Sequence, residues 1–350
     1  MFHAILSACL AANPPTCAPM TLVAQPFATL ADCKAQAPRI ADTWLGDRPS
    51  LVQGGLSCAP LADLPALPVQ AVAQGIHVHI GQIAQFEDSP DGWIANLGFV
   101  IGRDSIAVID AGASRQQGQA LFAAIRRISD KPISHLIVTH MHPDHAFGAE
   151  VFREAGAAVV GHARLGDALA ARGPVYLDNL TDLYGPGPMI GTRVVLPDIE
   201  VADRLDIDLG GRILTLTATG PAHSDNDLTV RDSATGTLFA GDLVFRGLTP
   251  IVDGSLPGWL DWMAAGQTGG PIVPGHGPVA ADWPQAVGAQ REFLTVLAAS
   301  TREAVAQGLP LSQAVPAIVA ALQPFASDWA SFPDSAARDA TAAFKELEWE

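Results

Sequence analysis

The hydrophobic pattern divides the chain into parts of different character. Between residues 76 and 240, short apolar runs rich in β-branched residues recur between Gly, Pro, Asp and Asn, which is typical of strands joined by turns. Residues 133–138 (ISHLIV) form such a run, and residues 76–80 alternate apolar and polar positions. From residue 283 to the end, the apolar positions follow helical spacing instead. The pattern predicts a strand-rich central part followed by a helical extension.

The elements predicted for the central part fall into two similar halves. Strands are expected at residues 76–80, 93–101, 105–109, 133–138 and 157–161, and then at 199–201, 205–209, 213–219, 228–231 and 237–240. Helices are expected at residues 117–128, 146–155 and 162–172, and in the extension at 284–307, 312–323 and 334–349. Residues 173–197 are rich in Gly and Pro and predict a long loop beside a substrate mouth. Residues 247–258 predict a second loop, followed by a short helix that carries Trp259 and Trp262.

The N-terminal segment, residues 1–68, has a pattern of its own. Residues 2–12 place their apolar side chains on one helical stripe, and residues 29–44 predict a second helix. Residues 59–68 (APLADLPALP) carry a proline every few positions and predict a semi-rigid linker. No Lys or Arg precedes the first apolar stretch, as it would in an export signal. We therefore expect that any export signal is atypical or lies upstream of this start.

The four cysteines all lie in this N-terminal segment, at Cys9, Cys17, Cys33 and Cys58. They lack the close C-x-x-C spacing of a zinc module, and an even number in a small segment predicts two disulfides with three possible connectivities. Disulfides imply an oxidising compartment such as a bacterial periplasm. The alternative is four reduced cysteines in a cytosolic protein.

Composition and charge narrow the classes of function. Of the 350 residues, 49% are hydrophobic and 16% are charged, which fits a globular protein and excludes a disordered one. The formal net charge of −16 argues against a nucleic-acid substrate, because phosphate binding needs a basic surface. An electrostatic partner would be basic or cationic, although acidity also serves solubility alone. The sequence has no run of about eighteen apolar residues, so no membrane span is predicted.

Candidate metal ligands are concentrated directly after the apolar run at residues 133–138. The sequence Thr-His-Met-His-Pro-Asp-His occupies residues 139–145, between that strand and a predicted helix. Alternate side chains of an extended chain point the same way, so His140 and His142 face one side together. Asp144 and His145 follow on the turn, where they can face a second ion. Imidazole and carboxylate together suit zinc and its first-row neighbours; the alternative is a surface cluster of histidines.

The arrangement H-x-H-x-D-H resembles the signature of the metallo-β-lactamase-fold hydrolases, and further motifs of that family follow in order. They are GPAHSD at residues 220–225, FAGD at 239–242 and VPGHG at 273–277. The resemblance covers roughly residues 76–279. It implies an α/β fold, the four-layer αβ/βα sandwich of the family. The domains expected are a helical, disulfide-stapled segment with its linker (1–68), a catalytic domain (69–281) and a helical extension packed on it (282–350).

The resemblance also implies a site for two zinc ions and no organic cofactor. The matching ligands are His140, His142 and His223 for the first ion, Asp144, His145 and His276 for the second, and Asp242 bridging both. Asp110 resembles the carboxylate that supports this site without binding an ion. Asp144 also resembles the catalytic residue that orients the nucleophile and passes protons. The implied reaction is attack by a metal-bridging hydroxide on an ester, lactone, amide or thioester of a small molecule.

A closer resemblance rests on the cysteine-bearing N-terminal segment, the run AHSDNDL at residues 222–228 and the ending KELEWE at 345–350. Together these features are similar to the quinoprotein relay system zinc metallohydrolases and the SoxH-type proteins. This implies a periplasmic hydrolase that serves a quinoprotein or sulfur-oxidation pathway, with a redox-pathway protein as a candidate partner. One alternative is a sulfur (persulfide) dioxygenase with a single iron at the first-ion positions. The other is a non-catalytic metal-binding accessory protein. Intact His145 and His276 favour two metals.

Overall fold

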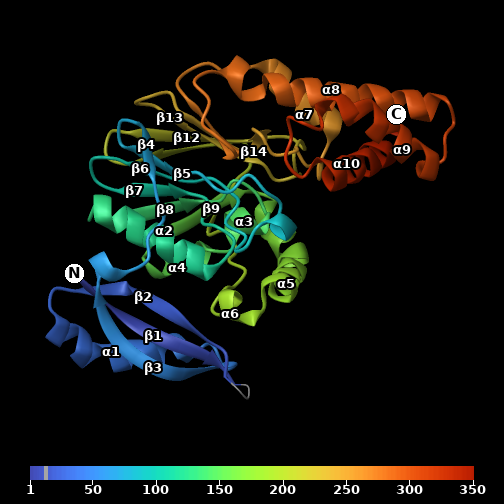
Figure 1. Cartoon of the computed structure of the whole chain (residues 1–350). Coiled ribbons are helices and arrows are strands. Elements are labelled where there is room, and N and C mark those ends of the chain that lie inside the picture. The colour runs from blue at the N-terminus through green and yellow to red at the C-terminus, as the bar shows by residue number, and fades with distance from the viewer. Residues whose placement is uncertain (12–14) are drawn as a thin grey trace.

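The chain folds into three parts that follow one another along the sequence (Figure 1). The structure is a computed structural model and describes residues 1–11 and 15–350. A small N-terminal sheet with one helix lies below a central body of two sheets, and a group of helices extends from the opposite side of that body. The two central sheets and the helices outside them form the four layers αβ/βα that the family resemblance implies.

The N-terminal module is a three-stranded sheet covered by one helix. It comprises β1 (Phe2–Leu10), β2 (Cys17–Phe27), α1 (Leu30–Leu45) and β3 (Leu51–Pro60), with strand order β2-β1-β3. The helix predicted at residues 2–12 is wrong: residues 2–10 form the central strand, and Ala12 lies outside the described residues. A short apolar run fits either element, and here strands on both sides satisfy its backbone. The second predicted helix is confirmed, with Pro38 inside it.

Two disulfides cross-link this module. Cys9–Cys17 joins β1 to β2, and Cys33–Cys58 joins α1 to β3. The prediction of two disulfides is therefore confirmed, and one of the three connectivities is selected. A module of this size buries only a small core, so covalent links between its elements add to its stability.

The central body consists of a seven-stranded and a five-stranded sheet packed face to face. The first, in the order β10-β9-β8-β7-β6-β5-β4, comprises β4 (Gln70–Ala73), β5 (Ile76–His79), β6 (Leu97–Ile101), β7 (Ile106–Ile109), β8 (Ile133–Ile137), β9 (Ala158–His162) and β10 (Ile199–Val201). The second, in chain order, comprises β11 (Arg204–Asp208), β12 (Ile213–Ala218), β13 (Leu228–Asp232), β14 (Leu238–Phe245) and β15 (Ile272–His276). Apolar side chains from both sheets meet in one buried cluster between them. Every predicted strand is present, with ends shifted by a few residues.

Helices lie along the outer faces of both sheets (Figure 1). Beside the first sheet are α2 (Arg115–Ile128), α3 (Pro143–Ala146), α4 (Ala149–Glu154), α5 (Leu165–Tyr184) and α6 (Pro186–Met189); beside the second are α7 (Leu256–Ala265) and α8 (Trp283–Ala306). The loop predicted at residues 173–197 is wrong for much of its length, because α5 continues through Gly173 and Pro174. Gly173 is buried against Val194, and a β-carbon there would come within 2.7 Å of a Val194 methyl group. Close packing, not a helix end, explains this glycine.

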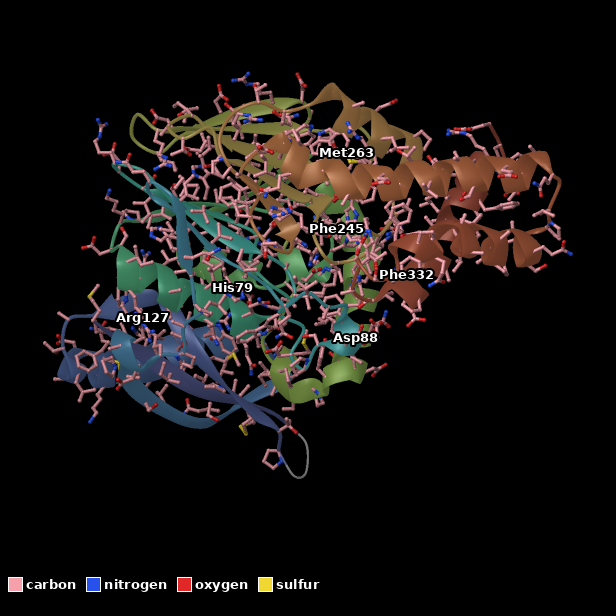
Figure 2. The ribbon with its side chains drawn as sticks, turned by 45° about the horizontal axis from the view of Figure 1, so that its top comes forward. His79, Asp88, Arg127, Phe245, Met263 and Phe332 are labelled. Carbon is pink, nitrogen blue, oxygen red and sulfur yellow. A yellow bond between two sulfur atoms is a disulfide. The ribbon has the colours of Figure 1, made fainter. Side chains whose placement is uncertain are left out.

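The C-terminal extension consists of α8, α9 (Leu311–Leu322) and α10 (Phe332–Leu347), as helical spacing predicts. Short 3-10 helices occur at Leu61–Asp63, Phe86–Asp88 and Gln323–Phe325. Figure 2 shows Phe332 at the start of α10 close to Asp88 of the central body, where Oγ of Ser331 donates to Asp88 at 2.6 Å. The extension thus packs on the central body. Within residues 1–11 and 15–350, no helix combines the length and the apolar character needed to cross a membrane.

A buried ion-pair network joins the N-terminal module to the central body. Arg48 of the module and Arg115 of α2 both contact Glu150 and Glu154 of α4, at N–O distances of 2.7–3.3 Å. The Arg115 side chain is fully buried, and Trp44 donates its indole N–H to Glu154 at 2.7 Å. Arg193 also lies 3.4 Å from Glu150, so two carboxylates face three guanidinium groups at this junction.

Asp339 of α10 gives the stability of the protein a pH dependence of its own. Its carboxylate accepts the Val252 N–H at 2.9 Å, and burial raises the pKa of Asp339 from its ordinary 3.8 to about 8. The folded state thus holds this proton more tightly than the unfolded state. The stabilisation it provides is complete below about pH 4 and is lost as the pH rises to about 8.

We therefore expect the Asp339→Asn variant to lose less unfolding free energy between about pH 5 and about pH 8 than the wild type does. Urea unfolding at both pH values measures this. Parallel losses in the two proteins would contradict it.

Candidate metal centre

The seven predicted ligands converge at one edge of the two sheets. His140 and His142 lie in the turn after β8, Asp144 and His145 in α3, His223 between β12 and β13, Asp242 in β14, and His276 at the end of β15. Parallel pairing places β14 beside β15, and Gly275 makes room between them. A β-carbon at Gly275 would overlap the carboxylate of Asp242. The structure thus brings residues from both halves of the sandwich to one place.

The first cluster contains His140, His142, His223 and Asp242. Nε2 of His140 and Nε2 of His223 each lie 3.0 Å from Nδ1 of His142. Oδ2 of Asp242 lies 3.6 Å from Nε2 of His140 and 3.5 Å from Nε2 of His223. One ligand atom from each residue lies within 4.8 Å of all the others. Three imidazoles and a carboxylate at this spacing are a donor set for a first-row cation.

The second cluster contains Asp144, His145 and His276. Oδ2 of Asp144 lies 3.5 Å from Nε2 of His145 and 3.3 Å from Nε2 of His276. Asp242 reaches this cluster too, because its Oδ1 lies 3.1 Å from Nε2 of His145 and its Oδ2 lies 3.3 Å from Nε2 of His276. The Asp242 carboxylate therefore stands between the two clusters.

The hydrogen bonds around the histidines determine which ring nitrogen carries the proton. The outward contacts are His140 Nδ1 to Thr139 Oγ1 (3.1 Å), His142 Nε2 to Asp253 Oδ2 (3.2 Å), His145 Nδ1 to Asp110 Oδ2 (2.8 Å), His223 Nδ1 to the Ile251 carbonyl (2.8 Å) and His276 Nδ1 to the Ile94 carbonyl (3.0 Å). Carbonyl and carboxylate oxygens only accept, so the nitrogens facing them donate. The Thr139 hydroxyl donates to Asp110, so it accepts from His140. All five rings, when neutral, therefore turn an unprotonated nitrogen toward the clusters.

This inward set of lone pairs and carboxylates fits cations. Nε2 of His145 and Oδ1 of Asp242 are buried and, within the described residues, not aligned for any hydrogen bond. Burial lowers the pKa of His276, but the carboxylates of Asp242 and Asp144 outweigh it and raise that pKa to about 9. Burial likewise opposes the charged form of His145, yet Asp242, Asp144 and Asp110 hold its pKa well above the usual value. The site attracts positive charge, and divalent cations can displace these protons.

Asp110 forms hydrogen bonds with both Thr139 and His145 of the motif at residues 139–145. It adopts φ of 60°, which is rare for a residue other than glycine. Its carboxylate accepts the Thr139 N–H at 2.8 Å, the Thr139 hydroxyl at 2.9 Å and the Nδ1–H of His145 at 2.8 Å. Three hydrogen bonds thus hold a strained backbone at the ligand cluster. This geometry agrees with the predicted supporting role of Asp110.

The clusters open into a pocket of about 620 Å³. Tyr176, Leu180 and Leu183 of α5 line it, so residues 173–197 do stand beside the mouth although they are largely helical. The other apolar lining comes from Phe86, Ile94, Phe245, Ile251 and Val252. Gln85, Glu87, Asn179 and Asp182 line it too, so the pocket combines an ionic centre with walls that are partly apolar and partly polar.

Sequence reasoning missed several polar residues of this pocket, and two of them bear on the chemistry. Asp253, in the second predicted loop, accepts from His142 and also pairs with Arg172. Arg338 of α10 lines the pocket, and in the described part of the chain no carboxylate lies within ion-pair distance of it. Neither residue belongs to a recognisable motif. The only signal for Asp253 was its place in a polar loop within the catalytic region.

Comparison with known proteins identifies the family. The family model described as the metallo-beta-lactamase superfamily matches residues 90–291, which is more than half of the chain. The chain belongs to the metallo-beta-lactamase superfamily. The four-layer fold and the order of the ligand motifs agree with this membership. Membership and the two ligand clusters support the prediction of a metal-dependent hydrolase.

Solved structures of other proteins share this fold. A metallo-beta-lactamase from Pontibacter korlensis is 19% identical with a TM-score of 0.54, and the likeness covers 65% of this chain and 99% of that one. TMB-1 is 16% identical with a TM-score of 0.51, covering 66% and 98%. A double mutant of the sec-alkyl sulfatase PisA1 is 15% identical with a TM-score of 0.59, covering 81% of this chain and 51% of that one.

One curated relative is similar over a short stretch. The linear primary-alkylsulfatase of Pseudomonas sp. (strain ATCC 19151) is 41% identical over 49 residues, which is 14% of this chain. The match spans only 9% of that alkylsulfatase.

The role of Asp110 leads to a prediction about metal affinity. Asp110→Asn removes the carboxylate that accepts from Nδ1 of His145, so we expect the affinity for one of two cations to fall by about 10- to 100-fold. Competition with a chromophoric chelator measures this. Asp104→Asn, on an exposed carboxylate, is the matched control. An Asp110→Asn protein with wild-type affinity for both ions would contradict the prediction.

Proposed function

We propose that this protein is a dinuclear zinc-dependent hydrolase of the metallo-beta-lactamase superfamily, acting on an ester, lactone, amide or thioester. The observation that carries the proposal is the pair of ligand clusters joined by Asp242 at a pocket with apolar walls. His140, His142 and His223 would hold one ion, and Asp144, His145 and His276 the other. When bound, such cations lower the pKa of a water molecule and polarise the carbonyl of a substrate.

The residues of this chain have separate tasks in that reaction. Each of the five histidines, when neutral, presents an unprotonated ring nitrogen to the clusters. This is because an oxygen outside the clusters accepts a hydrogen bond from its other ring nitrogen. Asp144, which lines the pocket, is the residue that orients water and accepts its proton. The apolar walls bind the body of the substrate and exclude bulk water from the reacting bond. Nothing in this scheme requires a serine or cysteine nucleophile.

A sulfate ester is a second candidate substrate. The likeness to the sec-alkyl sulfatase covers a larger share of this chain than the likeness to the metallo-beta-lactamase or to TMB-1, and the curated relative is also an alkylsulfatase. Arg338, a pocket cation without a described ion-pair partner, suits an anionic group, and the apolar walls suit an alkyl chain. Carboxylic esters and alkyl sulfates are therefore the two classes to compare.

A substrate panel tests these proposals. We expect the zinc-loaded protein to turn over at least one member of a set of short carboxylic esters, lactones, thioesters and linear alkyl sulfates, and to lose this activity after chelation. Turnover limited to alkyl sulfates would support the second candidate. No zinc-dependent turnover of the whole set would count against both.

Arg338 should affect only substrates that carry negative charge. For an anionic substrate, we expect Arg338→Ala to raise KM about tenfold, because a charge-assisted hydrogen bond is lost. KM for a neutral ester should stay within about twofold of the wild-type value. Steady-state kinetics on a matched pair of substrates measures the difference. An equal change for both would contradict the assignment.

The proposal also covers the cellular location of the protein and the pathway that it serves. Two disulfides are compatible with a location outside the cytoplasm, and a periplasmic location agrees with the resemblance to the quinoprotein relay and SoxH-like group. We propose that the protein serves a quinoprotein or sulfur-oxidation pathway and that the module within residues 1–68 is available to a redox-pathway protein. Residues 69–281 and 282–350 are proposed as the catalytic domain and its extension. Cell fractionation with thiol labelling tests the location: protein found in the cytoplasm with reactive thiols would contradict it.

A further inference from the structure

The loop between β14 and α7 holds two ligands of the first cluster. The Ile251 carbonyl accepts from Nδ1 of His223 at 2.8 Å, and Oδ2 of Asp253 accepts from Nε2 of His142 at 3.2 Å. These contacts orient two of the three imidazoles. A shift of this loop therefore changes the direction in which both lone pairs point.

The loop is in turn held by the C-terminal extension. Val252 lies between Ile251 and Asp253. Its N–H donates to Oδ1 of Asp339 in α10 at 2.9 Å. The N–H and hydroxyl of Thr249 both donate to the Ala330 carbonyl, at 3.2 and 2.7 Å. At the far end, the Leu256 N–H donates to Glu346 at 2.9 Å. The contact made by Asp339 lies closest in sequence to the two histidine contacts.

The second cluster is oriented by different elements. Nδ1 of His145 is held by Asp110, which follows β7, and Nδ1 of His276 is held by the Ile94 carbonyl. Asn96 secures the latter segment by donating to the carbonyls of Pro274 and Gly277, both at 2.8 Å. These contacts lie in the central body. Asp110 also reaches His140 of the first cluster, but only through the Thr139 hydroxyl. The direct supports of the two clusters are thus different.

Asp339 is also a costly residue to bury. Its side chain is fully inaccessible, and its Oδ2 has no hydrogen-bond partner within the described residues. A buried polar atom without a partner costs about 1–3 kcal/mol. An apolar residue at this position of α10 would avoid that cost but would leave the Val252 N–H without its acceptor.

We propose that Asp339 is a positioning residue for the metal centre, which sets the affinity of the His140, His142 and His223 site through the backbone of Val252. The inference rests on the proposed two-ion function and deepens it, because it makes the C-terminal extension a determinant of one ion and not of the other. Asp339 acts through the loop and touches neither the ions nor the substrate.

Stepwise zinc affinities, measured by competition with chromophoric chelators, test the proposal. We expect Asp339→Ala to weaken one of the two binding steps by about 10- to 100-fold and to leave the other within about twofold. Asp339→Asn keeps an oxygen that accepts the Val252 N–H, so it should restore wild-type affinity. Phe293→Leu is the control: it cuts into the buried core of the same extension without removing a hydrogen bond to the loop, and it should alter neither step.

Combination with Asp110→Asn shows which ion is affected. Since Asp110 bonds directly only to a ligand of the second cluster, the double variant Asp339→Ala/Asp110→Asn should weaken both steps, each by about the amount seen in the single variants. A double variant that still weakens only one step would overturn the inference. So would unchanged affinities in Asp339→Ala, or equal losses in Asp339→Ala and Phe293→Leu. A wild-type protein that binds fewer than two zinc ions would instead overturn the proposed function, and this inference with it.

Discussion

We expect Asp242→Asn to lower kcat/KM about a thousandfold or more and to reduce the bound metal from about two ions per chain to one or fewer. Asp242 is the only residue whose carboxylate reaches both clusters among the described side chains. The substitution replaces a buried carboxylate by a neutral amide of the same shape, so it removes negative charge that both cations would share. A loss of about 4 kcal/mol of transition-state stabilisation corresponds to this rate change.

The control for this variant is Asp225→Asn. Asp225 follows His223 by two residues, is exposed, and contacts the neighbouring Asn226 rather than either cluster. It should keep both activity and metal content. Elemental analysis together with steady-state kinetics measures the effect, and circular dichroism verifies that the variant is folded. Asp242→Asn with two ions and near wild-type activity would exclude Asp242 as the shared ligand.

The second large effect concerns stability at the junction of the N-terminal module. Arg115→Ala is expected to lower the free energy of unfolding by about 3–5 kcal/mol, because it leaves Glu150 and Glu154 buried with one cation fewer. Denaturant unfolding measures this change. The exposed pair of Arg103 and Asp104 offers a matched control, since Arg103→Ala should leave the free energy of unfolding close to the wild-type value.

Comparing the stability losses of the two arginine variants shows how much the buried ion pairs contribute. If Arg115→Ala and Arg103→Ala had equally small effects, the buried network would contribute little and the module would be held by apolar contacts alone. A large loss restricted to Arg115→Ala would instead mean that Glu150 and Glu154 of α4 need this cation for the stability of the folded state.

The convergence of the candidate ligands was predictable because they lie in short motifs at strand ends. His140, His142, Asp144 and His145 are adjacent in sequence, so their convergence needs only one strand and one turn. Assigning the distant His223 depended on recognising the order of motifs in the family. Periodicity alone could not have placed it beside His142, because that contact crosses from one sheet of the sandwich to the other.

Elements whose conformation depends on tertiary packing were harder to predict. Residues 2–10 fit a helix or a strand equally well, and pairing with β2 and β3 decided between them. Gly173 and Pro174 indicated a loop, yet both lie inside α5. Packing on Val194 accounts for that glycine, and such a contact leaves no trace in local sequence.

The supports of the metal centre were the least predictable part. Asp253 and the Ile251 carbonyl lie in a segment that looked like an ordinary loop, and Asp339 lies in a helix of the extension. The contacts of Asp253 and Asp339 join residues 111 and 87 positions apart, and the contact of the Ile251 carbonyl spans 28. A backbone carbonyl, moreover, has no side-chain signature in a sequence.

Metal content tests the central claim most directly. Elemental analysis of the full chain, purified without chelators, should find close to two zinc ions per chain, because seven ligands form two clusters that share Asp242. About one iron per chain and no zinc would contradict the two-zinc hydrolase and favour the sulfur dioxygenase, for which persulfides would be the next substrates to assay.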